Sequence, residues 1–226
     1  MFQGYQTVQD MVNKFRPKAE TVETATFGMG CFWGPDAMFG SLRGVLRTRV
    51  GFAGGTSPKP TYRHMGDHTE TVEIDFDPSV ISYEEILRTF WKNHYPNRGN
   101  YKGRQYISLL RYHGERQKEA VFRIKEEMEK QLGEPIETDI SAFRDFTLAE
   151  DKHQKYYLKR YPNTLHQLDD LFSQPELLVD STFAARLNGF VKGFGKLPLL
   201  KKEIASWNIE EENKETLLNK LETMKW

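Results

Sequence analysis

The chain has 226 residues, of which 38% are hydrophobic, 13% aromatic and 28% charged, so it can bury the core of one domain with an extension. Its 32 basic and 32 acidic residues give a formal net charge of zero, which excludes a global field that would attract nucleic acid or an anionic membrane. The single cysteine excludes a disulfide within this sequence and any cysteine-rich metal site. Because no stretch is apolar enough to span a membrane and the N-terminus has no signal-peptide pattern, we expect a cytoplasmic protein.

Strand and helix signals alternate in the first third of the chain, after a polar N-terminal extension (1–21). In chain order, the sequence predicts an amphipathic helix over 7–15, a strand over 23–30, a helix over 31–42, a β-rich run over 45–53, a Gly- and Pro-rich loop over 54–60 and a strand over 70–76. In the last of these, Val72, Ile74 and Phe76 alternate with polar residues, which is typical of a strand with one apolar face.

The next elements follow the same logic. Ser82 and Glu85 form a capping-box pattern that predicts the start of a helix running to about residue 91. It is followed by a predicted loop over 95–103, a strand over 105–112, a charged helix over 115–132 and a short strand over 137–141.

The first six elements of the main domain have the order β-α-β-β-α-β, which is that of a split-βαβ, ferredoxin-like arrangement. We therefore predict an α+β fold: a two-layer α/β sandwich with a ferredoxin-like (βαββαβ) core. In that fold the helices cover one face of an antiparallel sheet, and the start of the first helix lies near the loops that follow other strands.

The pattern changes near residue 163, where apolar residues recur at helical spacing through to the C-terminus. We predict a catalytic-type domain over 22–162 and a helical C-terminal extension over 163–226 that packs on it. A run of basic residues in the extension is interpreted as a solvated face. It consists of Lys192, Lys196, Lys201 and Lys202.

Cys31 lies in the sequence Gly-Cys-Phe-Trp-Gly (30–34), where a predicted strand passes into a predicted helix. Unpaired backbone N–H groups and the helix dipole at such a position favour a thiolate, and flanking glycines let the backbone approach a ligand closely. The pattern is that of a presented nucleophile. The alternative is a buried cysteine that serves only packing.

Six blocks of the sequence, in the right order over residues 22–160, resemble the A-type peptide methionine sulfoxide reductases. They are the blocks at 30–34, 49–62, 68–72, 90–94, 103–108 and 149–156. The resemblance implies a two-layer α/β fold with a ferredoxin-like core, in agreement with the predicted element order. It also implies reduction of the S-epimer of methionine sulfoxide, in peptides, proteins or as the free amino acid, to methionine.

The resemblance also implies roles for individual residues. Cys31 would be the nucleophile, and Glu70 the acid that protonates the sulfoxide oxygen, with a pKa raised by burial. Tyr62 and Tyr106 would bind that oxygen. Phe32 and Trp33 would form the apolar cradle for the S-methyl group, and His94 would also line the substrate pocket.

Each assignment has an alternative. Glu70 could be an exposed carboxylate, Tyr62 a loop residue and Tyr106 an ordinary strand aromatic, while His94 could satisfy carbonyl groups at a helix end. His64 and a second histidine four residues later suggest a metal pair, but the intervening glycine disfavours a helix, and we predict no metal site.

The sequence departs from the family pattern in three ways. It has no resolving cysteine in its C-terminal region, so the sulfenic acid left on Cys31 would need an external thiol: thioredoxin, glutaredoxin or a small-molecule thiol, with no bound cofactor. Tyr101 follows Asn100 where the family usually has an aspartate, and Tyr95 follows His94 where the family has another. The loop between Tyr62 and the 68–72 block is short.

We expect the partners to be peptides or proteins that contain methionine sulfoxide and the thiol reductant, without nucleic acid or membrane. The alternatives are a non-catalytic or altered-specificity relative that binds an oxidised peptide or a partner, and a thiol that senses peroxide.

Overall fold

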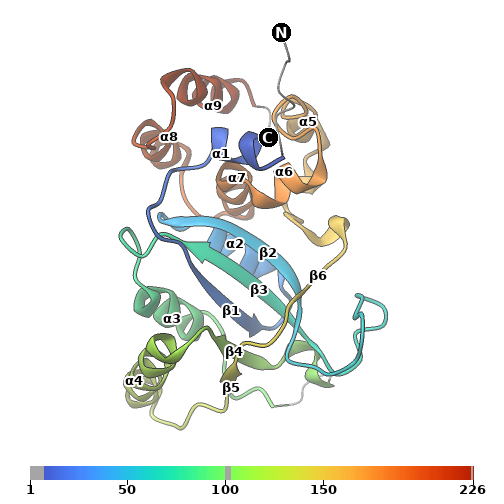
Figure 1. Cartoon of the computed structure of the whole chain (residues 1–226), viewed down its shortest axis with the longest axis vertical. Helices are drawn as coiled ribbons and strands as arrows, with labels where there is room; N and C mark the ends of the chain where they lie inside the picture. The colour runs from blue at the N-terminus through green and yellow to red at the C-terminus, as the bar shows by residue number, and fades with distance from the viewer. Residues whose placement is uncertain (1–7, 100–102, 225) are drawn as a thin grey trace.

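The computed structural model describes residues 8–99, 103–224 and 226 (Figure 1). Its centre is a six-stranded sheet with the order β5-β4-β1-β3-β2-β6. The strands are β1 (Glu23–Met29), β2 (Val45–Ala53), β3 (Thr69–Phe76), β4 (Ser108–Tyr112), β5 (Asp139–Ala142) and β6 (Thr147–Leu148).

The four central strands have the order β4-β1-β3-β2, and every neighbouring pair among them is antiparallel. This is the order that a split βαβ produces, because each crossover helix leaves room for one strand between the two that it connects. The α+β prediction with a ferredoxin-like core is therefore confirmed. Two edge strands extend it, since β5 pairs parallel with β4 and β6 pairs antiparallel with β2.

Three helices share one core with one face of the sheet: α2 (Trp33–Gly40), α3 (Tyr83–Lys92) and α4 (Glu115–Leu132). Phe27, Phe39 and Phe90 are fully buried there. The predicted alternation in β3 is also present, since its apolar residues lie in this core. The predicted capping box at the start of α3 forms: the Ser82 hydroxyl accepts from the Glu85 amide at 3.2 Å, and the Glu85 carboxylate accepts from the Ser82 amide at 2.9 Å.

The opposite face of the sheet carries polar residues of β3 that are also buried. Glu73 and Asp75 are buried and pair with Arg49 and Arg47 of the neighbouring strand. Arg47 also pairs with Asp180 at 2.7 Å, which joins this face to the C-terminal part of the chain. These carboxylates are therefore buried as ion pairs, since a buried charge needs a partner.

The extension is helical as predicted, and it forms a second core with Leu158 and Phe15 (Figure 1). Its helices are α5 (Pro162–His166), α6 (Pro175–Asp180), α7 (Thr182–Lys192), α8 (Leu197–Ala205) and α9 (Glu211–Thr223). The N-terminal helix α1 (Val8–Lys14) packs against α6. Residue 7, the start of the predicted helix, lies outside the described residues.

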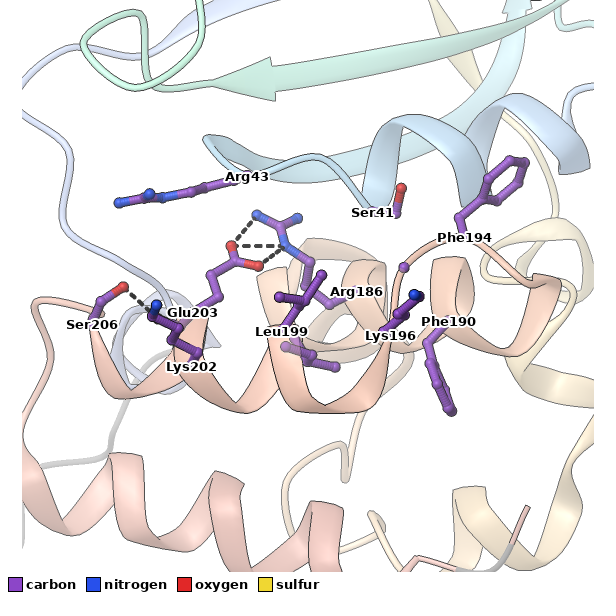
Figure 2. Close-up of a pocket in the computed structure, with 12 residues that line it drawn as sticks. Ser41, Arg43, Arg186, Phe190, Phe194, Lys196, Leu199, Lys202, Glu203 and Ser206 are labelled. Carbon is purple, nitrogen blue, oxygen red and sulfur yellow. Dashed lines mark hydrogen bonds and ion pairs between the residues drawn. The ribbon is translucent and has the colours of Figure 1, made fainter.

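Helix α7 crosses α2 at close range because both helices carry a glycine at the crossing. A Cβ on Gly40 would lie 2.8 Å from the Ala185 carbonyl oxygen, and one on Gly189 would lie 2.7 Å from the Ala37 carbonyl oxygen. Arg186 of α7 donates to the Gly40 carbonyl at 2.6 Å and pairs with Glu203 of α8 (Figure 2). The extension is thus bonded to the helix that follows Cys31.

Candidate active site

Cys31 lies between the end of β1 and the start of α2, as the sequence predicted. Gly30 makes this turn with φ of 98°, a conformation that favours glycine, and a Cβ there would lie 2.6 Å from an Arg98 guanidinium nitrogen. Cys31 itself is exposed, so it is not a buried packing residue. An external molecule can reach the thiol.

The electrostatics of the thiol differ from the expectation that the helix N-terminus favours a thiolate. Partial desolvation raises the pKa of Cys31, and the negative charge of Glu70 raises it further. The backbone N–H of Trp33 donates to the sulfur and lowers the pKa, as expected for this position, but does not outweigh the other two effects. At rest the thiol therefore keeps its proton more strongly than an ordinary cysteine.

Glu70 is fully buried near the start of β3, which excludes the exposed alternative. One carboxylate oxygen accepts from the backbone N–H of Phe32 at 3.1 Å, and the other accepts from the side-chain amide of Gln105 at 2.8 Å. Desolvation raises the pKa of Glu70, although both hydrogen bonds act in the opposite direction. This carboxyl group next to Cys31 is therefore able to hold a proton nearer neutral pH.

Tyr62 and Tyr106 come together although they lie on different loops. The two phenols interact through a side-chain hydrogen bond. Burial, followed by the charge of Glu70, raises the pKa of both phenols, so both remain hydrogen-bond donors. Tyr106 lies in a single 3₁₀ turn (Gly103–Tyr106) that precedes β4, and not in the strand that was predicted to begin at residue 105.

Aromatic rings surround this group. Phe32 is 1% exposed, and its ring lies 6.1 Å from Phe52 and 6.3 Å from Tyr62 between ring centroids. Trp33 stacks on Tyr156 with a centroid separation of 3.7 Å and an interplanar angle of 3°. The thiol therefore stands beside an apolar, aromatic wall.

Four residues that contact the predicted site were not among the candidates, although each lies in a block that carried the resemblance. Gln105 holds Glu70, and Tyr156 covers Trp33. His153 is buried; its Nδ1 accepts from the Trp33 indole at 3.3 Å, and its ring lies 4.3 Å from that of Tyr62. The fourth, Glu150, accepts from the Tyr62 amide at 3.3 Å. The sequence signal that could have identified these four residues was their position inside those blocks.

The geometry of His94 fits the alternative given for it. Its Nδ1 bonds to the Phe90 carbonyl and its Nε2 to the Ser108 hydroxyl, each at 2.7 Å. Burial lowers the pKa of His94 to about 4, so the ring is neutral near pH 7. Both ring nitrogens are thus engaged at the end of α3, and we do not include His94 in the proposed substrate pocket.

Of the histidine pair considered as a metal site, His68 has a structural role. His68 is buried in a loop, where its ring bonds to the Gly55 amide at 3.3 Å and the Ser57 carbonyl at 2.8 Å. Within the described residues, no group of three or more histidine, cysteine, aspartate or glutamate side chains could hold a metal ion. In the same part of the chain, none of the helices has the length and hydrophobicity needed to cross a membrane. Asn100 and Tyr101 lie outside the described residues.

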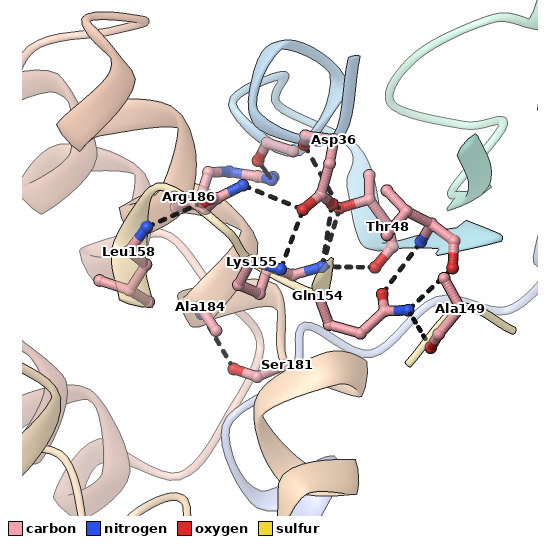
Figure 3. Close-up of polar contacts among 12 residues, drawn as sticks. Asp36, Thr48, Ala149, Gln154, Lys155, Leu158, Ser181, Ala184 and Arg186 are labelled. Atoms are coloured by element: carbon pink, nitrogen blue, oxygen red, sulfur yellow. Dashed lines mark hydrogen bonds and ion pairs between the residues drawn. The ribbon is translucent and has the colours of Figure 1, made fainter. Parts of the chain in front are cut away.

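A second buried carboxylate, Asp36, lies in the first turn of α2 (Figure 3). It accepts from the Thr48 hydroxyl at 2.6 Å, from the Lys155 ammonium at 3.0 Å and from the Asn188 amide at 3.1 Å. Lys155 is fully buried, and its ammonium also donates to the Thr48 carbonyl. Since Asn188 belongs to α7, this network joins the extension to the helix that carries the thiol at its start.

Comparisons with known proteins match the chain to one family. The family model described as "Peptide methionine sulfoxide reductase" matches residues 23–179. A peptide methionine sulfoxide reductase of Drosophila melanogaster is 48% identical over 184 residues, which cover 81% of this chain and 74% of that protein. The peptide methionine sulfoxide reductase MsrA of Methanosarcina acetivorans is 41% identical over 164 residues, or 68% of this chain and 87% of that protein.

Solved structures give the same result. Methionine sulfoxide reductase A of Corynebacterium diphtheriae aligns with a TM-score of 0.55 and 32% identity, over 64% of this chain and 77% of that one. Mxr1 of Saccharomyces cerevisiae in its reduced form aligns with a TM-score of 0.59 and 29% identity, over 65% of this chain and 90% of that one. The chain therefore belongs to the peptide methionine sulfoxide reductase family.

Proposed function

We propose that the protein reduces (S)-methionine sulfoxide to methionine in peptides and proteins, and as the free amino acid, with Cys31 as nucleophile and Glu70 as acid. The observation that carries the proposal is the placement of Glu70. Its buried carboxyl group is bonded to the amide of the residue that follows Cys31, and its pKa is raised. A sulfoxide oxygen must be protonated before the sulfur becomes a good electrophile, and a buried carboxylic acid supplies that proton.

The chemistry balances with these two groups. The Cys31 sulfur attacks, the oxygen atom passes from the sulfoxide to Cys31, and Cys31 becomes a sulfenic acid as the substrate sulfur becomes a thioether. The cysteine sulfur loses two electrons and the substrate sulfur gains them. The proton that leaves the thiol ends on the sulfenic oxygen, and Glu70 is placed to carry it. The raised pKa of Cys31 suits this coupled transfer, because the thiol brings the proton that the oxygen needs.

The neighbouring side chains support recognition of the substrate. Tyr62 and Tyr106 are hydrogen-bonded to each other, so the hydroxyl hydrogen of one of them stays free to bond a sulfoxide oxygen. In this proposal Phe32 and Trp33 receive the S-methyl group, with Trp33 fixed by its stacking on Tyr156. An apolar wall favours the uncharged thioether side chain of the substrate.

An external thiol completes the cycle, and no bound cofactor is needed. The first thiol displaces the sulfenic oxygen as water and forms a mixed disulfide with Cys31; a second thiol releases Cys31 and leaves as the disulfide of the reductant. The sequence has no other cysteine, and Cys31 is exposed, so an incoming thiol can reach it. Thioredoxin, glutaredoxin and small-molecule thiols remain the candidate reductants.

The proposed location is the cytoplasm, although relatives from human, cow and mouse are named mitochondrial. We also keep the proposed division at residue 162, between a catalytic domain and a supporting extension. A peroxide sensor is the less favoured function, because a sensing thiol needs a low pKa and that of Cys31 is raised.

The test is a reductase assay on peptides that carry each methionine sulfoxide epimer, with dithiothreitol as reductant. We expect methionine from the S-epimer only, and no activity from Cys31→Ser, because a serine hydroxyl is a much weaker nucleophile than a thiol and cannot form a sulfenic acid. Without reductant, intact-mass analysis should find one added oxygen on the chain per methionine formed. Activity of Cys31→Ser above a few per cent of the original, or equal reduction of both epimers, would reject the proposal.

A further inference from the structure

A groove opens between the C-terminal end of α2 and helices α7 and α8, away from Cys31 (Figure 2). This α7–α8 groove is bounded by Arg43, Phe194, Lys196, Leu199, Lys202 and Glu203 and encloses about 530 Å³. A volume of several hundred Å³ is typical of a site that holds a ligand. Cys31 precedes α2 and the groove lies at the other end of that helix, about 12 Å further along its axis.

The groove carries uncompensated positive charge. Arg43, Lys196 and Lys202 are exposed, and none of them has an acidic partner within the described part of the chain. The two other lysines of the predicted solvated run are engaged elsewhere: Lys192 lies over an aromatic ring, and Lys201 pairs with a glutamate. Three unpaired cations on one groove are a local concentration of positive charge in a sequence whose net charge is zero.

Glu203 does not neutralise these cations, because it already forms a fork with Arg186 at 2.8–3.1 Å. Arg186 is 4% exposed and is held in addition by the Gly40 and Val45 carbonyl oxygens at 2.6 and 2.9 Å. The floor of the groove is therefore the Arg186–Glu203 ion pair, which is held in a fixed geometry. A preorganised floor lowers the entropy cost of binding.

The walls of the groove are apolar. Phe194 and Leu200 line it, and Leu199 stands at its edge with 63% of its surface exposed. Apolar side chains surrounded by charged ones are the usual composition of a recognition site, in which the apolar contact supplies affinity and the charges supply steering and specificity.

The site is elongated. A second hollow of about 160 Å³ adjoins it and shares Arg43, Arg186 and Glu203 with it. Lys18 lies on this second hollow as a further cation without an acidic partner in the described residues, and the Asp77 carboxylate, which accepts from Ser79, lies on it as well. Two joined hollows, with the unpaired cations concentrated in the first, suit an extended chain segment better than a compact molecule.

We propose that the α7–α8 groove binds an acidic peptide segment with an apolar side chain, as part of a partner protein. The apolar side chain enters between Phe194 and Leu199, and the carboxylates pair with Arg43, Lys196 and Lys202. This binding requires no chemistry at Cys31 and stands apart from the reductase reaction.

The test uses a short, methionine-free, fluorescein-labelled peptide in which Glu alternates with Leu, and measures fluorescence anisotropy with the full chain. We expect a dissociation constant of the order of 10⁻⁵ M, which falls in the usual range for short segments. The double variant Lys196→Glu with Lys202→Glu should bind at least about tenfold more weakly. Raising the ionic strength should weaken binding to the unaltered protein, since exposed charges are screened.

The matched control is Lys92→Glu with Arg144→Glu, which makes the same charge change at exposed residues elsewhere. It should bind the peptide within about twofold of the original protein, because salt screens charges that lie far from the groove. Melting temperatures of both double variants establish that they are folded. Equal affinity of the two double variants, equal binding of a peptide with Lys in place of Glu, or binding of decanoate without binding of the peptide would each overturn the proposal.

Discussion

Two buried carboxylates lie beside the first turn of α2, and they differ in what neutralises them. Glu70 accepts hydrogen bonds only from neutral groups, the backbone amide of Phe32 and the side-chain amide of Gln105. Asp36 accepts a hydrogen bond from the charged ammonium group of Lys155 as well as from neutral donors. Both carboxylates are 0% exposed, so depth does not separate them. The difference between them is the cation beside Asp36, because a buried carboxyl group without a cation nearby tends to keep its proton.

The two carboxylates also join different parts of the molecule. Glu70 adjoins the exposed thiol and the two phenols, whereas Asp36 adjoins Lys155 and Asn188 of the extension. We therefore expect changes around Glu70 to alter the rate with little effect on stability. Changes around Asp36 should alter stability with little effect on the rate of the folded enzyme.

The largest expected effect is that of Glu70→Gln, which keeps the size of the side chain but removes the transferable proton. Turnover with the S-epimer should fall by about 10²–10⁴-fold, the usual contribution of a general acid. The melting temperature should change little, because no buried charge is left unpaired. Single-turnover kinetics and thermal unfolding on the same preparation measure both. A fall of less than about fivefold would remove Glu70 from the proposed mechanism.

The second prediction concerns Lys155→Met, which leaves Asp36 buried without its cation. The free energy of unfolding should fall by about 3–5 kcal/mol, as when one partner of a buried ion pair is removed. Urea unfolding measures it. The turnover of the fraction that remains folded should stay within about twofold of the original.

Its control is the double variant Asp36→Asn with Lys155→Met, which removes both charges. It should recover part of the lost stability, because no uncompensated charge remains. A double variant less stable than Lys155→Met would show that the pair does not act as a charge pair.

The sequence predicted most of the fold because its local signals were consistent. The order of strands and helices, the alternation through Ile74 and the capping box at Ser82 leave few possible topologies. The site was also partly predictable, since Cys31 and Glu70 lie in recognisable blocks, and the structure brings them together.

The sequence did not predict the network around Asp36. Its partners Lys155 and Asn188 lie 119 and 152 residues away, and a lysine in a sequence is usually expected to be exposed. The role of Gln105 was missed for another reason: a single 3₁₀ turn resembles the start of the following strand in a residue pattern. Such long-range partners depend on how α7 packs on α2, which local periodicity does not encode.

The third prediction concerns Asn188→Ala, which removes one neutral donor from Asp36. It also removes the acceptor of the Leu158 backbone amide, so two buried hydrogen bonds are lost. The cost should be about 2–4 kcal/mol of unfolding free energy. The matched control is Thr182→Val, which removes the bond from the same helix to the Leu46 carbonyl on β2. Both variants should keep turnover within about twofold. A tenfold loss of turnover in Asn188→Ala alone would mean that the extension sets the geometry of the thiol.

The smallest expected effect is a shift in pH dependence. Gln105 donates to Glu70 and lowers its pKa, so Gln105→Leu should raise that pKa further. If protonated Glu70 is the acid, turnover is present below its pKa and is lost as the pH rises through it. The alkaline fall in the turnover profile should therefore move to higher pH in Gln105→Leu. The shift should be about one pH unit, since a hydrogen bond to a charged group contributes about 1.5 kcal/mol and one pKa unit corresponds to about 1.4 kcal/mol.

Gln105→Glu should move the fall in the same direction, because its added carboxylate also raises the pKa of Glu70. Gln105→Asn is the control: where its shorter amide still reaches the carboxyl, the profile stays near that of the original. An unmoved alkaline fall, together with a rise on the acid side that moves to higher pH in Gln105→Leu, would mean that the ionised form of Glu70 is the active one, and Glu70 would then not be the acid.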